Sequence, residues 1–391
     1  MRIAMIGQKG MPATYGGVER HVHDLAVRLV KAGHQVTAYS RAWYNGGQTG
    51  LVEGVSVVLL PSVKSQSLDT ITHTVLASIQ AARSKFDVIH YHGVGPSLMA
   101  WIPRLLSPRT KIVATFHSID RHQPKWGRFA KFMLRLGEWC ACRLAHDTIV
   151  VSKSLQNYCL NEYNRITNYI PNGTALRRTE KVSATPLTQF GLKPNEYLLM
   201  VARLIPTKGA HLLIEAFEQL KKLSHPISDN LKLAIVGDSV GTDAYVARLK
   251  AQAAGNTNIV FTGFQSGQTL RALYSHSYAV VHPSFSEGLP ITVLEAMSYA
   301  KPVLVSDIIE HLEVVTDRRM LYAQNSVRDL TRSLKEFLDL PPAEQQAIGL
   351  INRQLVRAHF SWDTLVPQTI AVYQNPVPDA SVSRKEILAT T

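Results

Sequence analysis

The sequence predicts an α/β protein with two parallel-sheet domains, and three observations support this. Short apolar runs alternate with longer segments of helical periodicity along most of the chain, which is typical of strands that are buried on both faces of a parallel sheet. The alternation occurs in two series, separated by a polar segment at 176–190 that reads as a linker. The chain of 391 residues is also longer than a domain with a single hydrophobic core usually is.

The first series predicts strands at residues 2–6, 35–39, 55–59, 88–91, 111–116 and 148–151. A helix is expected after the first strand, because apolar residues recur there at the spacing of one helical face. These residues are Val22, Leu25, Ala26 and Leu29. The first domain is therefore expected to span 1–180.

The second series predicts strands at residues 197–201, 232–236, 259–261, 279–282 and 302–305. The second domain is expected to span 181–360. Ser361 then caps a helix that continues to about residue 375. The tail at 376–391 is polar and contains proline, so we expect it to be disordered.

Composition excludes several classes of protein. Hydrophobic residues make up 46% and charged residues 18% of the chain, which is usual for a folded globular protein. The three cysteines imply no disulfide framework, so a reducing compartment fits best. No stretch has the length of a signal-peptide core or of a membrane span. We therefore expect a cytoplasmic protein.

Positive charge is concentrated in the first half. The formal net charge is +13, and residues 1–180 contain 22 basic and 10 acidic side chains. Such an excess of positive charge favours binding of nucleic acid, anionic lipid or phosphorylated ligands. No nucleic-acid-binding motif is present, so we expect no nucleic acid partner. Residues 121–143 instead predict a basic helix, which either lies on an anionic membrane or packs on the core with a solvated basic side.

The most informative stretch runs from Tyr278 to Met297 and reads as a strand, a glycine turn and a helix that opens at Pro290. Backbone N–H groups at such a helix start bind anions, and Gly288 lets a ligand approach the backbone. Glu287 and Glu295 flank this turn, and carboxylates accept hydrogen bonds from paired hydroxyls. A ligand with both phosphates and vicinal diols, such as a nucleotide sugar, is therefore predicted.

These residues resemble the glutamate pair of retaining glycosyltransferases of family 4, which have the GT-B fold. The segment at 197–217 is similar to the first strand and loop of that family's C-terminal domain. Further likenesses lie at Gly16-Gly17, Asn172-Gly173, Gly237-Asp238, Gly263-Phe264 and Phe360-Ser361-Trp362. The resemblance covers about residues 1–375. It implies two Rossmann-like domains facing an interdomain cleft, with the acceptor bound by the first and the nucleotide sugar by the second. It also implies that the C-terminal helix at 361–375 returns to the first domain.

The resemblance also implies roles for individual residues. Arg203 and Lys208 would bind the donor diphosphate, Glu287 the sugar hydroxyls, and Glu295 the ribose. His117, at the end of an expected strand, would lie beside the transferred sugar. The remaining donor-binding positions that it implies are Gly16, Gly17, Gly237, Phe264, Gly288 and Leu289.

The implied reaction moves a hexose or deoxyhexose from a nucleoside diphosphate to a hydroxyl of a glycan or lipid-linked glycan, with retention of configuration. No metal and no cofactor beyond the donor substrate are expected. The subgroup that is most similar contains bacterial exopolysaccharide and O-antigen enzymes, some of them rhamnosyltransferases, which would act at the inner face of the plasma membrane. Two alternatives are a nucleotide-sugar epimerase or hydrolase with the same fold, and a nucleotide-sugar-binding protein without catalysis.

Overall fold

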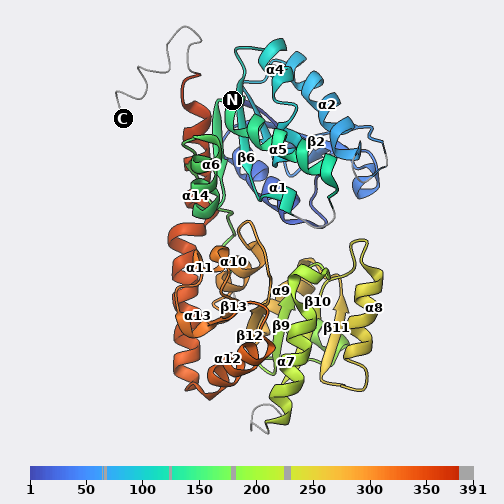
Figure 1. Cartoon of the computed structure of the whole chain (residues 1–391), viewed down its shortest axis with the longest axis vertical. Coiled ribbons are helices and arrows are strands. Elements are labelled where there is room, and N and C mark those ends of the chain that lie inside the picture. The colour runs from blue at the N-terminus through green and yellow to red at the C-terminus, as the bar shows by residue number, and fades with distance from the viewer. Residues whose placement is uncertain (64, 66–67, 123–125, 178–181, 224–229, 378–391) are drawn as a thin grey trace. The chain divides into compact units, whose positions relative to one another are not determined.

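The protein is described by a computed structural model (Figure 1), which covers residues 1–391 except 64, 66–67, 123–125, 178–181, 224–229 and 378–391. The chain divides into two units. The first consists of Met1–Pro171 together with Trp362–Thr391, and the second of Asn172–Ser361. Each unit is a parallel sheet covered by helices, so the predicted α/β class with two Rossmann-like domains is confirmed.

The first unit is built on an eight-stranded sheet with the order β3-β4-β2-β1-β5-β6-β7-β8. All neighbours are parallel except β3, which runs antiparallel to β4. Strands such as β6 are buried along their whole length, and this is why they appear in the sequence as continuous apolar runs. The strands are β1 Arg2–Ile6, β2 Gln35–Arg41, β3 Gly50–Val52, β4 Val55–Leu60, β5 Val88–His92, β6 Lys111–Phe116, β7 Asp147–Val150 and β8 Asn168–Tyr169.

The helices of this unit cover its sheet. They are α1 Gly17–Lys31, α2 Leu68–Arg83, α3 Val94–Ser97, α4 Trp101–Leu106, α5 Arg128–Arg143, α6 Lys153–Tyr163 and α14 Trp362–Gln374, with short 3-10 turns η1 Tyr44–Gly47 and η2 Asp120–His122. The predicted apolar face of α1 is confirmed, because Val22, Leu25, Ala26 and Leu29 are all buried. Among the described residues, none of the protein's helices combines the length and apolar character needed to cross a bilayer.

The second unit has a six-stranded parallel sheet with the order β11-β10-β9-β12-β13-β14. Its strands are β9 Tyr197–Val201, β10 Lys232–Val236, β11 Ile259–Gly263, β12 Ala279–His282, β13 Val303–Ser306 and β14 Leu321–Tyr322. Its helices are α7 Ala210–Lys222, α8 Asp243–Gln252, α9 Gly267–His276, α10 Ile291–Ser298, α11 Ile309–Leu312, α12 Val327–Asp339 and α13 Pro342–Leu355. Short turns are η3 Thr185–Phe190, η4 Pro206–Lys208, η5 Arg318–Met320 and the π-helical η6 Val356–Phe360.

The division between the units differs from the predicted boundary at 180. The second unit begins at Asn172, because Thr174 pairs with Ser361 and its amide donates to the Phe360 carbonyl at 2.8 Å. Part of the predicted linker at 176–190 is structured, since η3 buries Leu187. The predicted disordered tail at 376–391 lies outside the described residues from 378 onwards.

The C-terminal helix α14 belongs to the first unit, where it packs against α1. Its Tyr373 hydroxyl is 2.7 Å from His90 Nδ1. Lys111 Nζ donates to the carbonyl of Asn375 at 2.5 Å. The chain therefore returns to its first sheet through buried polar contacts as well as apolar ones.

Candidate functional site

Two loops of the second unit carry a compact cluster of charge. Lys208 ends η4, which follows β9, and Glu287 lies between β12 and α10. Because β12 and β9 are parallel neighbours, both loops leave the same edge of the sheet. In open α/β sheets this carboxyl edge is where ligands bind.

Glu287 is the centre of this cluster. Its Oε1 forms an ion pair with the Lys208 ammonium and lies 2.8 Å from His282 Nε2. Both side chains of the ion pair are largely buried, with 14% of Lys208 and 11% of Glu287 exposed. Oε2 has no protein partner among the described residues, so it can accept a hydrogen bond from a ligand hydroxyl.

The surroundings keep Glu287 ionised. Burial alone would raise the pKa of its carboxyl, but the Lys208 ammonium and the His282 hydrogen bond outweigh burial and hold the pKa well below its usual range. The cluster therefore presents a fixed carboxylate beside a fixed ammonium. Such a pair can bind a hydroxyl and a phosphate oxygen side by side.

A second histidine supports the first. The ring of His311 meets that of His282 edge-on at 5.4 Å, and its Nδ1 lies 2.8 Å from the Ser306 carbonyl oxygen. Burial lowers the pKa of His311 to about 3. A neutral His311 therefore holds His282 in place without adding a positive charge.

Glycine at position 209 lets the two loops meet. A Cβ on Gly209 would lie 2.1 Å from the Pro283 carbonyl oxygen, and the residue has a φ of +71°. The Phe285 amide also donates to the Thr207 carbonyl at 2.8 Å. Backbone contact between the loops thus fixes Lys208 and Glu287 relative to each other.

Two other predicted residues lie apart from this pair. Arg203 follows β9, but its side chain is exposed and makes no hydrogen bond or ion pair within the part of the chain that the structure describes. Glu295 lies in α10 and accepts a hydrogen bond from the Tyr274 hydroxyl at 3.4 Å. The structure therefore brings Lys208 and Glu287 together but puts neither Arg203 nor Glu295 in contact with them.

The remaining donor positions follow strands or precede the helix. Gly237 follows β10 with a φ of +143°, where a Cβ would clash with the Ala202 carbonyl. Phe264 follows β11 and is half exposed, with 52% of its surface open. Gly288 and the buried Leu289 precede Pro290, which caps α10 rather than opening it. The Leu289 carbonyl accepts from the Asn172 side chain at 2.9 Å.

In the first unit, Gly16 and Gly17 form the start of α1. Gly16 caps the helix with a φ of 102°, and Gly17 is its first residue. Glu19 in the first turn accepts from the Lys9 amide at 3.1 Å and so closes the loop back on itself. The loop thus presents backbone at a helix start, as an anion site requires.

His117 follows β6 and lies in a buried group of histidines. Its Nε2 is 3.4 Å from His92 Nδ1, and its ring meets that of His21 at 4.9 Å. Burial, together with the neighbouring His21 and His90, lowers the pKa of His117 well below its usual value. A neutral His117 can exchange hydrogen bonds with a ligand but brings no charge to it.

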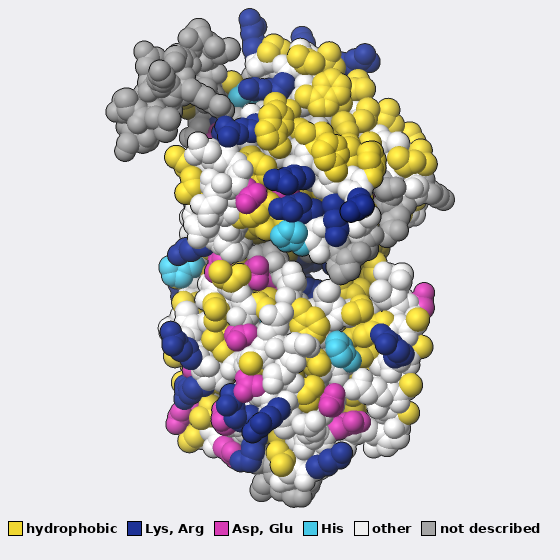
Figure 2. Space-filling view, viewed as in Figure 1, with side chains coloured by type: hydrophobic (Ala, Val, Ile, Leu, Met, Phe, Trp, Pro, Cys, Tyr) yellow, Lys and Arg dark blue, Asp and Glu magenta, His cyan; other side chains and the backbone are white. Residues whose placement is uncertain are grey.

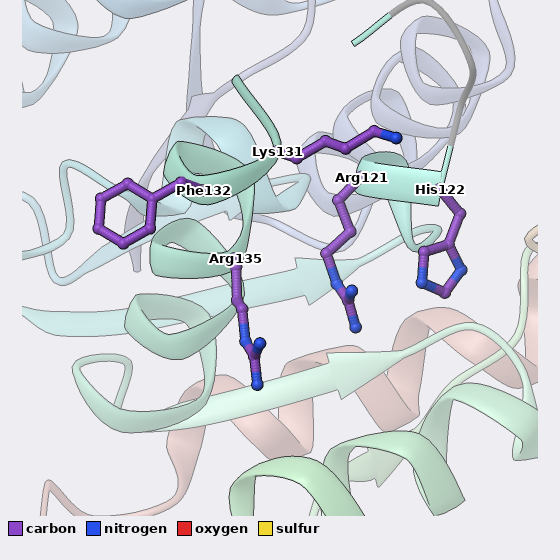
Figure 3. Close-up of a pocket in the computed structure, with 5 residues that line it drawn as sticks. All are labelled: Arg121, His122, Lys131, Phe132 and Arg135. Atoms are coloured by element: carbon purple, nitrogen blue, oxygen red, sulfur yellow. The ribbon is translucent and has the colours of Figure 1, made fainter. Parts of the chain in front are cut away.

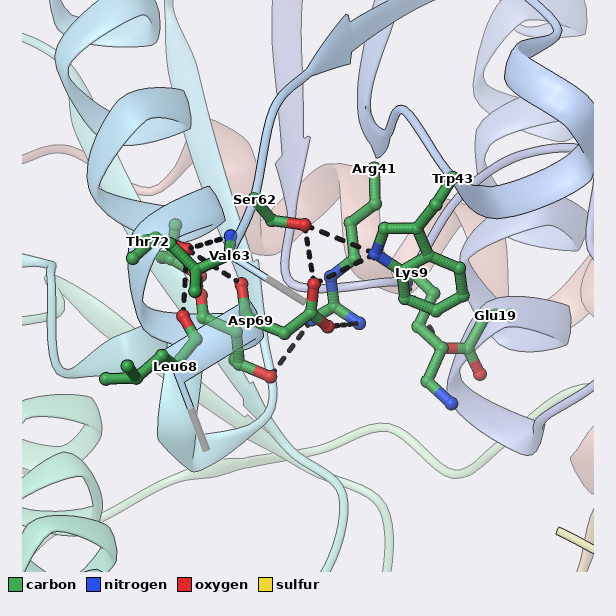
Figure 4. Close-up of polar contacts among 11 residues, drawn as sticks. Lys9, Glu19, Arg41, Trp43, Ser62, Val63, Leu68, Asp69 and Thr72 are labelled. Carbon is green, nitrogen blue, oxygen red and sulfur yellow. Dashed lines mark hydrogen bonds and ion pairs between the residues drawn. The ribbon is translucent and has the colours of Figure 1, made fainter. Parts of the chain in front are cut away.

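A polar cluster that the sequence analysis missed lies at the end of β2 (Figure 4). The buried Arg41 pairs with Asp69 at 3.0 Å and donates to the Thr70 hydroxyl at 3.0 Å. Asp69 also accepts from Trp43 at 3.0 Å and from Ser62 at 2.6 Å. The signal available in the sequence was an arginine directly after an apolar strand. The cluster places polar side chains and the partly exposed Trp43 at the carboxyl edge of the first sheet.

Among the residues that the structure describes, two groups of three side chains have ligand atoms close enough to hold a metal ion. Each group has these atoms within 4.8 Å of one another. One is His21, His92 and His117, and the other is His282, Glu287 and His311. In the second group the Lys208 ammonium already contacts the carboxylate.

Family models match both halves of the chain. The model described as Glycosyltransferase Family 4 matches residues 15–178, and the model described as Glycosyl transferases group 1 matches residues 188–351. The second match contains Arg203, Lys208, Glu287 and Glu295.

Individual relatives are distant but cover most of the chain. An uncharacterized glycosyltransferase of Methanocaldococcus jannaschii is 25% identical, covering 96% of this chain and 98% of the relative. The O-antigen chain mannosyltransferase C of Escherichia coli is 24% identical, covering 79% of this chain and 80% of the relative. The solved structure of HepE from Anabaena, in complex with UDP and glucose, has a TM-score of 0.79 at 21% identity and covers 96% of this chain and 100% of its own.

Proposed function

Since the chain belongs to the glycosyltransferases with the GT-B fold, we propose that it transfers a hexose or deoxyhexose from a nucleoside diphosphate to a hydroxyl of a glycan or lipid-linked glycan. The observation that carries the proposal is the cluster of Lys208, His282 and Glu287 at the carboxyl edge of the second sheet. A carboxylate beside an ammonium suits a sugar that is bonded to a diphosphate.

In this proposal Glu287 Oε2 accepts a hydrogen bond from a sugar hydroxyl, while Lys208 shares its ammonium between Glu287 and a phosphate oxygen. Negative charge grows on the diphosphate as the bond from the sugar C1 to the phosphate oxygen breaks. A fixed cation at that place stabilises the transition state more than the ground state. Arg203, which is free to move at the surface, would add a second cation when the donor binds.

We further propose that configuration is retained. The acceptor oxygen bonds to C1 on the face that the diphosphate leaves, and the acceptor proton moves to the departing phosphate oxygen. Lys208 and Arg203 supply positive charge in place of a metal ion. The neutral His117 would hydrogen-bond the sugar or the acceptor, and Gly16 and Gly17 would approach the distal phosphate.

A role in bacterial surface polysaccharide synthesis is part of the proposal. It is supported by the similarity to a relative named as an O-antigen chain mannosyltransferase and by the excess of positive charge in residues 1–180. Residues 121–143 would then contact the anionic inner face of the plasma membrane.

Thermal-shift screening against UDP, GDP, dTDP and ADP sugars tests the proposal, because a ligand that binds the folded state raises the melting temperature. We expect one base to stabilise the protein clearly more than the others. The sugar product, made from that donor with a glycan acceptor, should retain its anomeric configuration by NMR. Release of free sugar or an epimer with donor alone, and no transfer when acceptor is added, would contradict the proposal.

Glu295→Gln is expected to raise the Kd of the matching nucleoside diphosphate roughly 10- to 150-fold, the value of one charge-assisted hydrogen bond. The glutamine carbonyl can still accept from Tyr274, so the substitution removes charge and keeps the contact. Isothermal calorimetry measures the affinity. The exposed Glu215→Gln serves as the control and should bind like wild type. Equal affinity in both variants would remove Glu295 from the ribose site.

A further inference from the structure

A cavity of about 510 Å³ opens on the first unit, separate from the residues described above. It is lined by Arg121, His122, Lys131, Phe132 and Arg135 (Figure 3). The first two come from η2 and the others from α5. In Figure 3 the guanidinium groups of Arg121 and Arg135 and the imidazole of His122 point the same way. The lining thus holds three cations and no carboxylate, which suits an anion.

Hydrogen bonds to Glu138 and Tyr158 hold the Arg121 guanidinium in place. Its Nε donates to Glu138 Oε2 at 3.2 Å, and its Nη2 donates to the Tyr158 hydroxyl at 2.8 Å. Glu138 is fully buried and also accepts from the hydroxyls of Tyr158 and Tyr163, each at 2.7 Å. This network orients the guanidinium and neutralises its charge, but it does not involve Lys131 or Arg135.

Lys131 and Arg135 supply the excess positive charge. Both side chains are exposed, and the Lys131 ammonium forms no hydrogen bond or ion pair in the described part of the chain. Arg135 lies 3.9 Å from Glu162, and both of these side chains are exposed. A pair of this kind contributes about 0–1 kcal/mol, so Arg135 can exchange it for another anion. Two cations are therefore available to a ligand with about two negative charges.

Large exposed apolar side chains lie on α5, whose Phe132 lines the cavity, and on α4. Phe129 is 77% and Phe132 63% exposed. Also exposed are Leu136 and Trp139 of α5 and Trp101, Leu105 and Leu106 of α4. Figure 2 shows hydrophobic and basic side chains side by side over this part of the first unit. Exposed apolar groups of this size mark a lipid or partner surface.

Helix α5 is held in position by close contact with α3. A Cβ on Gly137 would lie 2.2 Å from the Val94 carbonyl oxygen, so only glycine permits this approach. Helix α3 in turn packs against α2, and α2 against α4. Helices α4 and α5 are therefore connected through a continuous series of packed helices.

We propose that this cavity binds the phosphate or diphosphate of a lipid-borne acceptor, with the aromatic side chains of α5 against the lipid chain. A free phosphate would contact the basic side chains but not the exposed apolar side chains of α5, so a lipid phosphate fits the observations better. The inference rests on the proposed function, because it names the class of acceptor that the enzyme uses. It places recognition of the acceptor's charged group on η2 and α5.

The test compares binding of the full-length protein to three vesicles: phosphatidylcholine alone, phosphatidylcholine with phosphatidylglycerol, and phosphatidylcholine with a polyprenyl diphosphate at equal surface charge. Wild type should prefer the polyprenyl diphosphate vesicles. Lys131→Gln/Arg135→Gln should weaken that binding about 30-fold, at about 1 kcal/mol for each basic side chain near a membrane surface. The matched control Lys31→Gln/Lys250→Gln removes two exposed charges elsewhere and should bind like wild type.

Three outcomes would overturn the inference. They are equal binding to phosphatidylglycerol and polyprenyl diphosphate vesicles, an unchanged preference in the cavity variant, and full competition by inorganic pyrophosphate at the affinity of the lipid. Nucleotide-sugar thermal shifts on the same proteins keep the two proposals apart. Loss of vesicle binding with an intact donor shift supports the cavity, whereas a wild type without any donor shift refutes the proposed function but leaves the vesicle result standing.

Discussion

Lys208→Met is expected to lower kcat/KM by roughly 100- to 1,000-fold, the usual effect of removing one donor aimed at charge that develops in the transition state. The ammonium lies in the loop after β9 and is held there by Glu287. Without it, charge on the departing diphosphate loses its nearest fixed cation. Steady-state kinetics with the donor identified by thermal shift measure the effect, and Lys208→Arg should recover part of the rate.

A double variant separates the two roles that Lys208 could have. Lys208→Met leaves the largely buried Glu287 carboxylate without its ammonium partner, so the protein should also lose stability. Lys208→Met/Glu287→Gln removes both charges and should regain much of that stability. Because Glu287 is itself proposed to bind the sugar, the double variant is compared with Glu287→Gln alone. If Lys208 binds the diphosphate, the double variant has a lower kcat/KM than Glu287→Gln. If Lys208 only neutralises Glu287, the two variants have equal kcat/KM, and the assignment of Lys208 to the phosphate is wrong.

The strands were the most predictable part of the fold. The ranges expected at 2–6, 111–116, 197–201, 232–236 and 279–282 agree with the observed strands, because a strand that is buried on both faces must be apolar along its length. The boundary between the units was less predictable. It is set by the pairing of Thr174 with Ser361, a contact between residues distant in sequence that polar composition does not reveal.

The candidate site was predictable to the extent that it follows local motifs. The Tyr278–Met297 stretch and the loop after β9 identified Glu287 and Lys208, which the structure brings into contact. The supporting His282 and His311 were missed, since a histidine at the end of a strand has no distinctive pattern. Arg41 and Asp69 were missed for a similar reason, because their pairing depends on how β2 and α2 meet in three dimensions.

Several histidines of the first unit are buried and held by hydrogen bonds, which their positions in the sequence do not reveal. His90 and His92 are both buried, and His90 is bonded to the Tyr373 hydroxyl and to the Thr115 hydroxyl at 2.7 Å each. Burial lowers the pKa of His90 to about 3 and that of His73 to about 4. Burial and neighbouring histidines also lower the pKa of His92 and of His117 well below the usual value.

Lowering the pH from 7 to 5 is therefore expected to destabilise the first unit strongly. These histidines stay neutral in the folded state but take up protons near pH 6.5 once the chain unfolds. Because the folded pKa lies below the unfolded one, their stabilising effect is complete above about pH 6.5 and is lost as the pH falls toward 4. At pH 5, His90 and His73 each cost about 2 kcal/mol, so together they remove about 4 kcal/mol of unfolding free energy, a large part of a typical domain's stability.

Tryptophan fluorescence measures this effect selectively, because all five tryptophans belong to the first unit. They are Trp43, Trp101, Trp126, Trp139 and Trp362. Urea midpoints followed by fluorescence should fall steeply between pH 7 and pH 5. His90→Gln should reduce the slope of the unfolding free energy by about 1.4 kcal/mol per pH unit, the contribution of one proton. A midpoint that does not change with pH, or an unchanged slope in the variant, would show that the buried histidines are not neutral.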